Sequence, residues 1–287
     1  MYTPVSIVIP VYKRAEWLSK CIAGLQQQEY AGAFETVVID DGSPNEAEIA
    51  AVIKQARFGR LPILFSRKTN AGPAAARNYG ARLASGEIIC FLDDDSIPDQ
   101  KWLHEIVSSF RNMPSVAVVS GHTCSYDREN PIPLLLEREV YPGKSWATCN
   151  IAYHRKAFEV LGGFDESFPE PSWEDNDLGL RSKWAGYLHV YNERAVVYHP
   201  HEHTLDEFKA KCLLNGRGAA VFCRKYLVSK PLWGIGAPLI MSRRLIFGLL
   251  PSVWLKKTSA SYLKFLWSFY SLQGFISSFA SGKHGKN

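Results

Sequence analysis

The sequence predicts an α/β fold in which helices flank a mostly parallel sheet. Three short apolar runs, at 5–9, 36–39 and 87–92, have the composition of buried strands. Segments with helical period, at 17–25 and 74–83, lie between these runs. Strands that alternate with helices join through right-handed crossovers into parallel sheets. The expected architecture is therefore Rossmann-like.

Each apolar run ends in residues that can carry chemistry. The first leads into Pro10 and Tyr12, the second into Asp40-Asp41-Gly42-Ser43, and the third into Asp93-Asp94-Asp95. Parallel sheets bind ligands at the carboxyl ends of their strands, so these residues are expected at one edge. Adjacent carboxylates repel one another, which favours a hard cation such as Mn2+ or Mg2+ and a diphosphate substrate. The alternative is a solvated acidic turn in which Asp99 helps to start a helix.

The second half of the chain is expected to continue with shorter elements. Residues 146–153 should form a strand, 155–161 a short helix and 162–165 a turn, before another helix opens. At the start of that helix, Ser172 and Asp175 match a capping box. A purely structural explanation of its acidic residues therefore remains open.

Charge is spread unevenly over the 287 residues, which suffice for one domain of about 200 residues and an appendage. No Asp or Glu follows Glu207, whereas 13 of the 33 Lys and Arg residues do. The residues up to Glu207 are thus formally −8 and the rest +13. This asymmetry predicts an anionic partner for the tail, either a lipid surface or a nucleic acid.

The longest charge-free stretch of the tail, 265–282, has 18 residues but contains five serines, which makes it too polar for a convincing membrane span. On a helix, Ser268, Ser271 and Ser278 form a polar stripe opposite an aromatic face, as in a helix that lies in a membrane interface. The alternative is a helical subdomain that packs on the rest of the chain or forms a dimer.

The cysteines and the N-terminus bear on the compartment. The six cysteines form no Cys-x-x-Cys pair, and Cys21 and Cys90 fall in apolar patterns typical of a core. The first strand begins at Val5 with no basic segment before it, so no signal peptide is expected. With the basic tail, these features predict a cytoplasmic protein that is peripheral to the inner face of the cell membrane.

Five segments in a fixed order carry a resemblance to a known family: Val5–Tyr12, Val38–Ser43, Asn70–Asn78, Phe91–Asp95 and Trp173–Leu178. Over about residues 4–205 the chain resembles a family 2 glycosyltransferase with the GT-A fold. The resemblance implies a domain at 1–205, with a donor half at 1–120 and an acceptor half at 121–205. The region 206–287 is then a helical, basic addition that is expected to associate with a membrane.

The resemblance also assigns roles around a nucleoside-diphosphate sugar donor and a Mn2+ or Mg2+ ion. It makes Asp95 the principal metal ligand, with Asp93 toward the ribose and the metal, and lets His199 complete the metal shell. For three of the donor contacts a structural explanation is open: Asp40 as a turn residue, Tyr12 as a packing aromatic and Arg77 as a surface charge. The implied donor-binding residues are Pro10, Tyr12, Asp40, Asn70, Arg77, Asp93 and Asp94.

For the acceptor half, the resemblance makes Asp175 the general base. An inverting transfer needs a carboxylate that takes the proton of the acceptor hydroxyl as its oxygen attacks the anomeric carbon. Trp173 and Glu174 are expected to contact the acceptor, and Asp177 has the i,i+4 spacing of an ion pair with Arg181. The glycines common before the family's Glu-Asp pair are replaced here by 169–173, which puts the shape of the acceptor pocket in doubt.

The leading functional hypothesis is a metal-dependent, inverting glycosyltransferase that serves cell-surface glycan or glycolipid synthesis. No Gln-x-x-Arg-Trp pattern is present, so it should add a single sugar to a glycan or a lipid-linked acceptor rather than polymerise. A phosphohydrolase with an aspartyl nucleophile would carry its motif on the first strand, and a dehydrogenase would carry Gly-x-Gly-x-x-Gly there. A protein that binds nucleotide sugars without transfer, or binds nucleic acid through its tail, is the non-enzymatic alternative.

Overall fold

The computed structural model describes residues 3–58, 61–126, 143–168, 170–200, 202, 204–227, 229 and 259–280. The chain divides into two compact units. The first contains the described residues up to 126, 143–165 and 175–200, and the second contains 166–174 and the described residues after 200.

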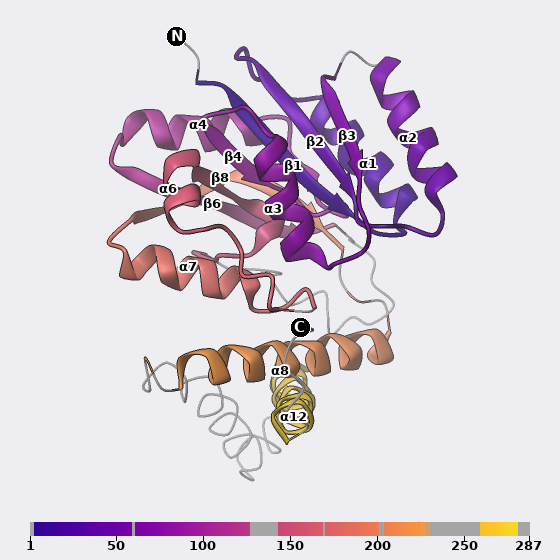
Figure 1. Ribbon diagram of the computed structural model, residues 1–287, viewed down its shortest axis with the longest axis vertical. Coiled ribbons are helices and arrows are strands. Elements are labelled where there is room, and N and C mark those ends of the chain that lie inside the picture. The colour runs from indigo at the N-terminus through magenta and orange to yellow at the C-terminus, as the bar shows by residue number, and fades with distance from the viewer. Residues whose placement is uncertain are drawn as a thin grey trace. The chain divides into compact units, whose positions relative to one another are not determined.

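The first unit is built on one eight-stranded sheet with the order β3-β2-β1-β4-β7-β6-β8-β5 (Figure 1). The N-terminal four strands are parallel, and β7 joins β4 to β6 through antiparallel pairs. The prediction of an α/β fold with a mostly parallel sheet is therefore confirmed. The strands are β1 (Val5–Val11), β2 (Phe34–Asp40), β3 (Ile63–Arg67), β4 (Ile88–Phe91), β5 (Ile97–Pro98), β6 (Val116–Ser125), β7 (Ile151–His154) and β8 (Leu188–His199).

Helices cover both faces of this sheet, so a central strand such as β1 must be apolar on both of its faces. Every residue of β1 is buried, because alternate side chains enter two different cores. Ile7 and Ile9 pack in one core with residues of α1, α2 and α4, whereas Val8 packs in the other with residues of α3, α6 and α7. The helices are α1 (Ala15–Gln26), α2 (Glu46–Phe58), α3 (Pro73–Leu83), α4 (Trp102–Asn112), α6 (Arg155–Val160) and α7 (Glu174–Trp184).

One predicted strand is shorter than expected. Of the segment 146–153 only the last three residues belong to a strand, β7, which ends at His154, and a 3-10 turn (Thr148–Asn150) precedes it. The cause is the buried side chain of Asn150, which accepts a hydrogen bond from Trp102 Nε1 and donates to the carbonyl oxygen atoms of His122 and Ala195. The chain therefore turns there before it pairs.

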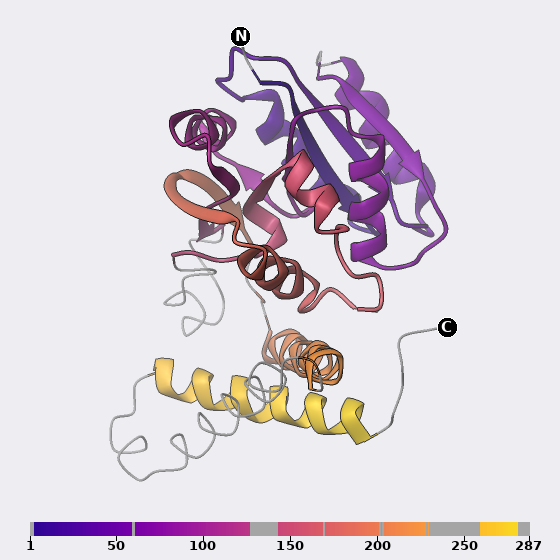
Figure 2. The same cartoon turned by 60° about the vertical axis from the view of Figure 1, so that its left-hand side comes forward.

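In the second unit, two helices of 22 residues cross each other, α8 (Leu205–Tyr226) and α12 (Ser259–Ala280), as Figure 2 shows. Thr204 and Glu207 form a capping box at the start of α8. Glycines bring the two backbones close: a Cβ atom on Gly216 would lie 1.9 Å from the carbonyl oxygen of Ser271, and one on Gly274 would lie 2.2 Å from that of Leu213.

The orientation of α12 corrects the prediction for its serines. Ser268 and Ser271 are fully buried and face the crossing, because only small side chains fit where two helix backbones approach so closely. Phe269, Ile276 and Phe279 are 46%, 57% and 41% exposed. The serine stripe thus belongs to the packed side of the helix. Within the part of the chain that is described, no helix is long and apolar enough to cross a membrane.

Candidate functional site

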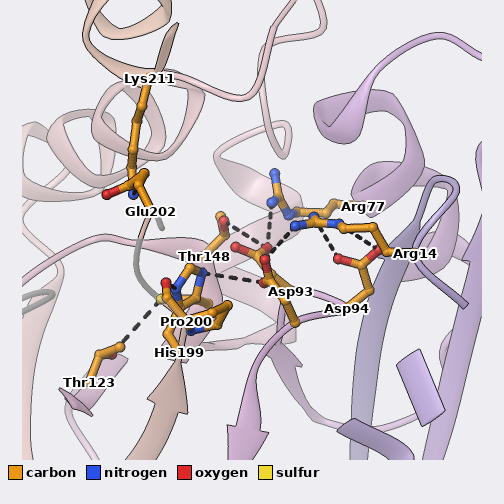
Figure 3. A network of polar contacts seen from close by, with 12 residues as sticks. Arg14, Arg77, Asp93, Asp94, Thr123, Thr148, His199, Pro200, Glu202 and Lys211 are labelled. Carbon is orange, nitrogen blue, oxygen red and sulfur yellow. Dashed lines mark hydrogen bonds and ion pairs between the residues drawn. The ribbon is translucent and has the colours of Figure 1, made fainter. Parts of the chain in front are cut away.

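The three consecutive acids lie directly beyond β4, in the middle of the sheet, and the end of β8 brings His199 to them (Figure 3). His199 Nε2 lies 3.3 Å from Asp95 Oδ1. Asp93, Asp95 and His199 each offer one ligand atom, and these atoms all lie within 4.8 Å of one another. Residues that are more than 100 positions apart in the sequence are therefore brought together as predicted. Two carboxylates and an imidazole suit Mn2+ and similar divalent ions.

Two arginines neutralise most of the charge of this cluster. Arg77, from α3, is buried and pairs with Asp93 at 2.7 Å, and the hydroxyl of Thr148 donates to the same carboxylate at 3.3 Å. Arg14, just before α1, pairs with Asp94 at 2.6 Å and also with Asp95. Arg77 is thus a buried partner of the acidic cluster and not a surface charge.

The sequence prediction missed Arg14, although a signal for it was present. Three adjacent acids at a strand end need counter-charges, and Arg14 is one of the few basic residues that follow a strand at the same sheet edge. Its side chain is 48% exposed, whereas that of Asp94 is 1% exposed. The guanidinium group can therefore reorient into solvent, but the carboxylate of Asp94 cannot.

The protonation states of the two inner acids differ. Burial raises the pKa of Asp94, against the opposing charge of Arg14. Burial acts in the same direction on Asp95, but His199 and Arg14 together hold the pKa of its carboxyl below the ordinary value. Asp95 is consequently the acid of this pair that stays ionised and can serve a cation.

Asp175 is the second residue of α7 and is half-buried. Its Oδ1 atom accepts hydrogen bonds from the backbone N–H of Asn176 at 2.6 Å and from the Asn176 side chain at 2.8 Å. Burial raises the pKa of Asp175, against these hydrogen bonds and the charge of Arg77. Since α7 begins at Glu174, Ser172 does not occupy the capping position that the alternative requires.

The next acid of α7 has a structural role that was predicted. Asp177 is fully buried and pairs with Arg181 at 2.8 Å, which confirms the i,i+4 ion pair. Arg181 also donates to the carbonyl oxygen atoms of Leu161 and Gly163. This ion pair therefore fixes the turn at 162–165 against α7.

The acid at the end of β2 has partners in its own loop and on β3. Asp40 is completely buried, accepts from the Ser43 backbone N–H at 2.8 Å and lies 3.5 Å from Arg67 Nε. These contacts are those of the turn alternative, so a hydrogen bond from a nucleotide base to Asp40 stays a prediction. Of the other expected donor contacts, Pro10 is buried in β1, Tyr12 is 41% exposed, and Asn70 donates to the carbonyl oxygen of Asp41 at 2.9 Å.

Trp173 and Glu174, expected at the acceptor, belong to the second unit. Glu174 is buried, and the indole of Trp173 donates a hydrogen bond to Asn215 of α8. An acceptor contact by either residue stays a prediction.

Comparison with known proteins identifies a family. Residues 6–161 match the family model described as glycosyl transferase family 2. Validoxylamine A glucosyltransferase of Streptomyces hygroscopicus subsp. jinggangensis is 28% identical and covers 80% of this chain, which in turn covers 63% of it. Glycosyltransferase AglE of Haloferax volcanii is 38% identical over a region that covers 68% of this chain and 66% of the relative. The pre-mycofactocin glycosyltransferase of Mycobacterium tuberculosis is 30% identical over a region that covers 75% of this chain and 47% of the relative. The chain thus spans about half to two thirds of the length of these relatives.

Solved structures share the fold. A mannosyltransferase from Pyrobaculum calidifontis in complex with GDP-Man and Mn2+ has a TM-score of 0.69 and 18% identity, over 99% of this chain and 89% of the other. S. aureus TarS 1-349 in complex with UDP has a TM-score of 0.54 and 16% identity, over 98% and 91% of the two chains. At such identities the likeness concerns the fold alone.

Proposed function

This chain belongs to glycosyl transferase family 2, and we propose that it transfers a single sugar from a nucleoside-diphosphate sugar to an acceptor hydroxyl, with inversion and with a divalent cation. The observation that carries the proposal is the group formed by Asp93, Asp95 and His199 at the carboxyl ends of the strands. The solved mannosyltransferase with GDP-Man and Mn2+ supports this choice of ligands by its fold.

The donor set fits Mn2+ or Mg2+, since the carboxylate of Asp95 is held ionised and His199 supplies an imidazole beside it. When bound, such an ion stabilises the negative charge that develops on the diphosphate as it leaves. The proposed donor half, within 1–120, supplies the remaining contacts. The proposed donor-binding residues are Pro10, Tyr12, Asp40, Asn70, Arg77, Asp93 and Asp94.

We assign to Asp175 the removal of the proton from the acceptor hydroxyl. Its raised pKa supports this role, because a base is most effective when its pKa approaches the working pH. The two hydrogen bonds from Asn176 hold one carboxylate oxygen and so orient the group. Trp173 and Glu174 belong to the proposed acceptor segment in the second half of the domain, 121–205.

A donor screen tests this function. GDP-mannose, UDP-glucose and other nucleotide sugars are incubated with the protein in Mn2+, Mg2+ or a chelator, and the released nucleoside diphosphate is measured. We expect one donor to be hydrolysed above the rest, with loss of the activity in the chelator. A protein that cleaves none of them, yet releases phosphate from p-nitrophenyl phosphate, would instead be a phosphohydrolase.

We further propose that the protein works on a glycan or lipid-linked acceptor while it is peripheral to an anionic membrane surface, on its cytoplasmic face. The support lies in α12, whose exposed residues Phe269, Ile276 and Phe279 follow each other at helical spacing. The excess of basic residues after Glu207 supplies charge of the complementary sign.

Sedimentation with liposomes that contain an anionic lipid tests this attachment. Replacement of Phe269, Ile276 and Phe279 by serine should release the protein from the liposomes. The matched control replaces three exposed apolar residues of the first unit, Phe58, Leu64 and Val160. If both triple variants sediment like the wild type, the exposed residues of α12 are not the attachment. If the wild type never sediments, the membrane role is wrong.

A further inference from the structure

The residue before α7 has a backbone conformation that its side chain disfavours. Trp173 has a φ of 73°, and only one other described non-glycine residue, Lys13, has a positive φ. A side chain with a Cβ atom clashes in this region, so such a residue persists only where its surroundings hold it. Trp173 therefore adopts a glycine-like conformation, and something must hold it there.

The indole of Trp173 is held by α8. Its Nε1 atom donates to Asn215 Oδ1 at 3.0 Å, and its ring packs on Phe222 with centroids 5.1 Å apart. Asn215 in turn donates through Nδ2 to the hydroxyl of Ser271 on α12 at 3.3 Å. A polar chain thus runs from Trp173 through α8 to the buried side of α12.

The residues just before Trp173 are fixed to the same helix. Arg217 pairs with Glu170 at 2.7 Å. The backbone of Ser172 lies so close to α8 that a Cβ atom on Gly218 would be 2.5 Å from the Ser172 carbonyl oxygen. The segment 170–173 is therefore attached to α8 by an ion pair, a backbone approach and the indole.

We infer that α8 and α12 form a clamp on the segment 170–173, and that Trp173 is a positioning residue for Asp175. Glu174 opens α7 and Asp175 follows it, so the conformation of residue 173 sets where the helix begins and where the carboxylate is presented. The inference rests on the proposed role of Asp175 as the base. It also gives a physical account of the positive φ of Trp173, because the hydrogen bond to Asn215 and the packing on Phe222 hold the indole in place.

Hydrogen–deuterium exchange on the full chain tests the clamp without reference to activity. Trp173→Phe removes the indole donor, Asn215→Ala removes its acceptor, and Trp173→Gly accepts a positive φ but has no anchor. We expect all three to raise the exchange rates of amides 174–178 by about tenfold or more. Arg224→Ala is the control, because Arg224 joins α8 to the Ser278 carbonyl oxygen elsewhere on the same helix pair. Unchanged exchange in Trp173→Gly would overturn the clamp.

The hydrolysis of GDP-mannose or UDP-glucose, with water as the acceptor, tests the positioning role. Trp173→Phe and Asn215→Ala should lower kcat roughly tenfold, with donor KM, affinity for GDP or UDP and thermal stability close to wild type. Faster exchange without a lower kcat overturns the positioning role and leaves the proposed function intact. Absence of donor hydrolysis in the wild type overturns the proposed function, whereas the exchange result still decides the clamp.

Discussion

Two acidic loops follow parallel strands on either side of β1, one after β2 and one after β4, and they use their carboxylates differently. After β2, Asp41 accepts from the backbone N–H groups of Ala71 and Gly72 and pairs with Lys68 at 2.7 Å. After β4, the charged partners of the acids are the side chains of Arg14, Arg77 and His199, and Asp94 also accepts from the Tyr12 backbone N–H. A carboxylate held by two backbone N–H groups, such as that of Asp41, supports the fold, whereas one held by charged side chains can exchange them for a ligand. We therefore expect the β2 loop to depend on Asp41 for its structure and the acids of the β4 loop to remain available to a ligand.

The largest effect is expected from Asp95→Ala in the second loop. It removes the ionised carboxylate of the proposed metal group, so the binding of GDP or UDP should lose its dependence on Mn2+ while the fold is retained. Calorimetry in Mn2+ and in a chelator measures this. Asp99→Asn is the control, because the carboxylate of Asp99 accepts from the nearby Lys101 backbone N–H and an asparagine oxygen can accept there too. Equal nucleotide affinity of Asp95→Ala and the wild type in Mn2+ would remove the metal site from the β4 loop.

Asp41→Ala in the first loop should instead act on stability. It removes the carboxylate partner of Lys68 and frees two backbone N–H groups, and the loss of such hydrogen-bond partners costs about 1 to 3 kcal/mol. Denaturant unfolding should show this loss. A variant with wild-type stability and impaired nucleotide binding would mean that the β2 loop is a ligand site after all.

Asp175→Asn extends the comparison to α7. Transfer should fall roughly 10²-fold, as is usual for the loss of a general base, while nucleotide and metal binding persist. Because the pKa of Asp175 is raised, transfer in the wild type should decline as the pH falls through this raised value, at higher pH than an ordinary aspartate would cause. A pH–rate profile checks both points. A near wild-type rate in Asp175→Asn would place the base elsewhere.

The sheet edge could be predicted because strand period and strand ends are local properties of the sequence. The pairing of Arg14 with Asp94 could not, since it depends on which strands become neighbours. The positive φ of Trp173 could not be predicted for a related reason. No neighbouring residue favours this conformation, and the hydrogen-bond partner of the indole, Asn215, lies 42 residues later in the sequence. For Ser271, amphipathic periodicity predicted solvent exposure, but the close crossing at Gly216 requires small residues inside.

The smallest effect is expected outside both loops, at His189 of β8. Burial and the charge of Lys144 lower its pKa to about 3, below the ordinary value of about 6.5. Between these two pH values the unfolded chain takes up a proton that the folded chain does not, so this group favours folding above pH 6.5 and its contribution is lost as the pH falls toward 3.

The measurement is the free energy of unfolding of His189→Gln and the wild type from pH 7 to pH 4. The advantage of the wild type should shrink as the pH falls, with little change near neutral pH, where His189 is neutral in both states. A difference that is constant over this range would mean that His189 titrates normally in the folded protein.

A cation that binds in the β4 loop must compete with the guanidinium groups of Arg14 and Arg77 for the carboxylates of the three acids. The two guanidinium groups already balance most of the negative charge of the three acids, because burial favours the protonated form of Asp94. A divalent ion that binds there would replace the arginines as partners of the carboxylates. The displaced guanidinium groups would then need other anions to balance their charge. A diphosphate supplies these charges, so cation and nucleotide should each strengthen the binding of the other by the same factor.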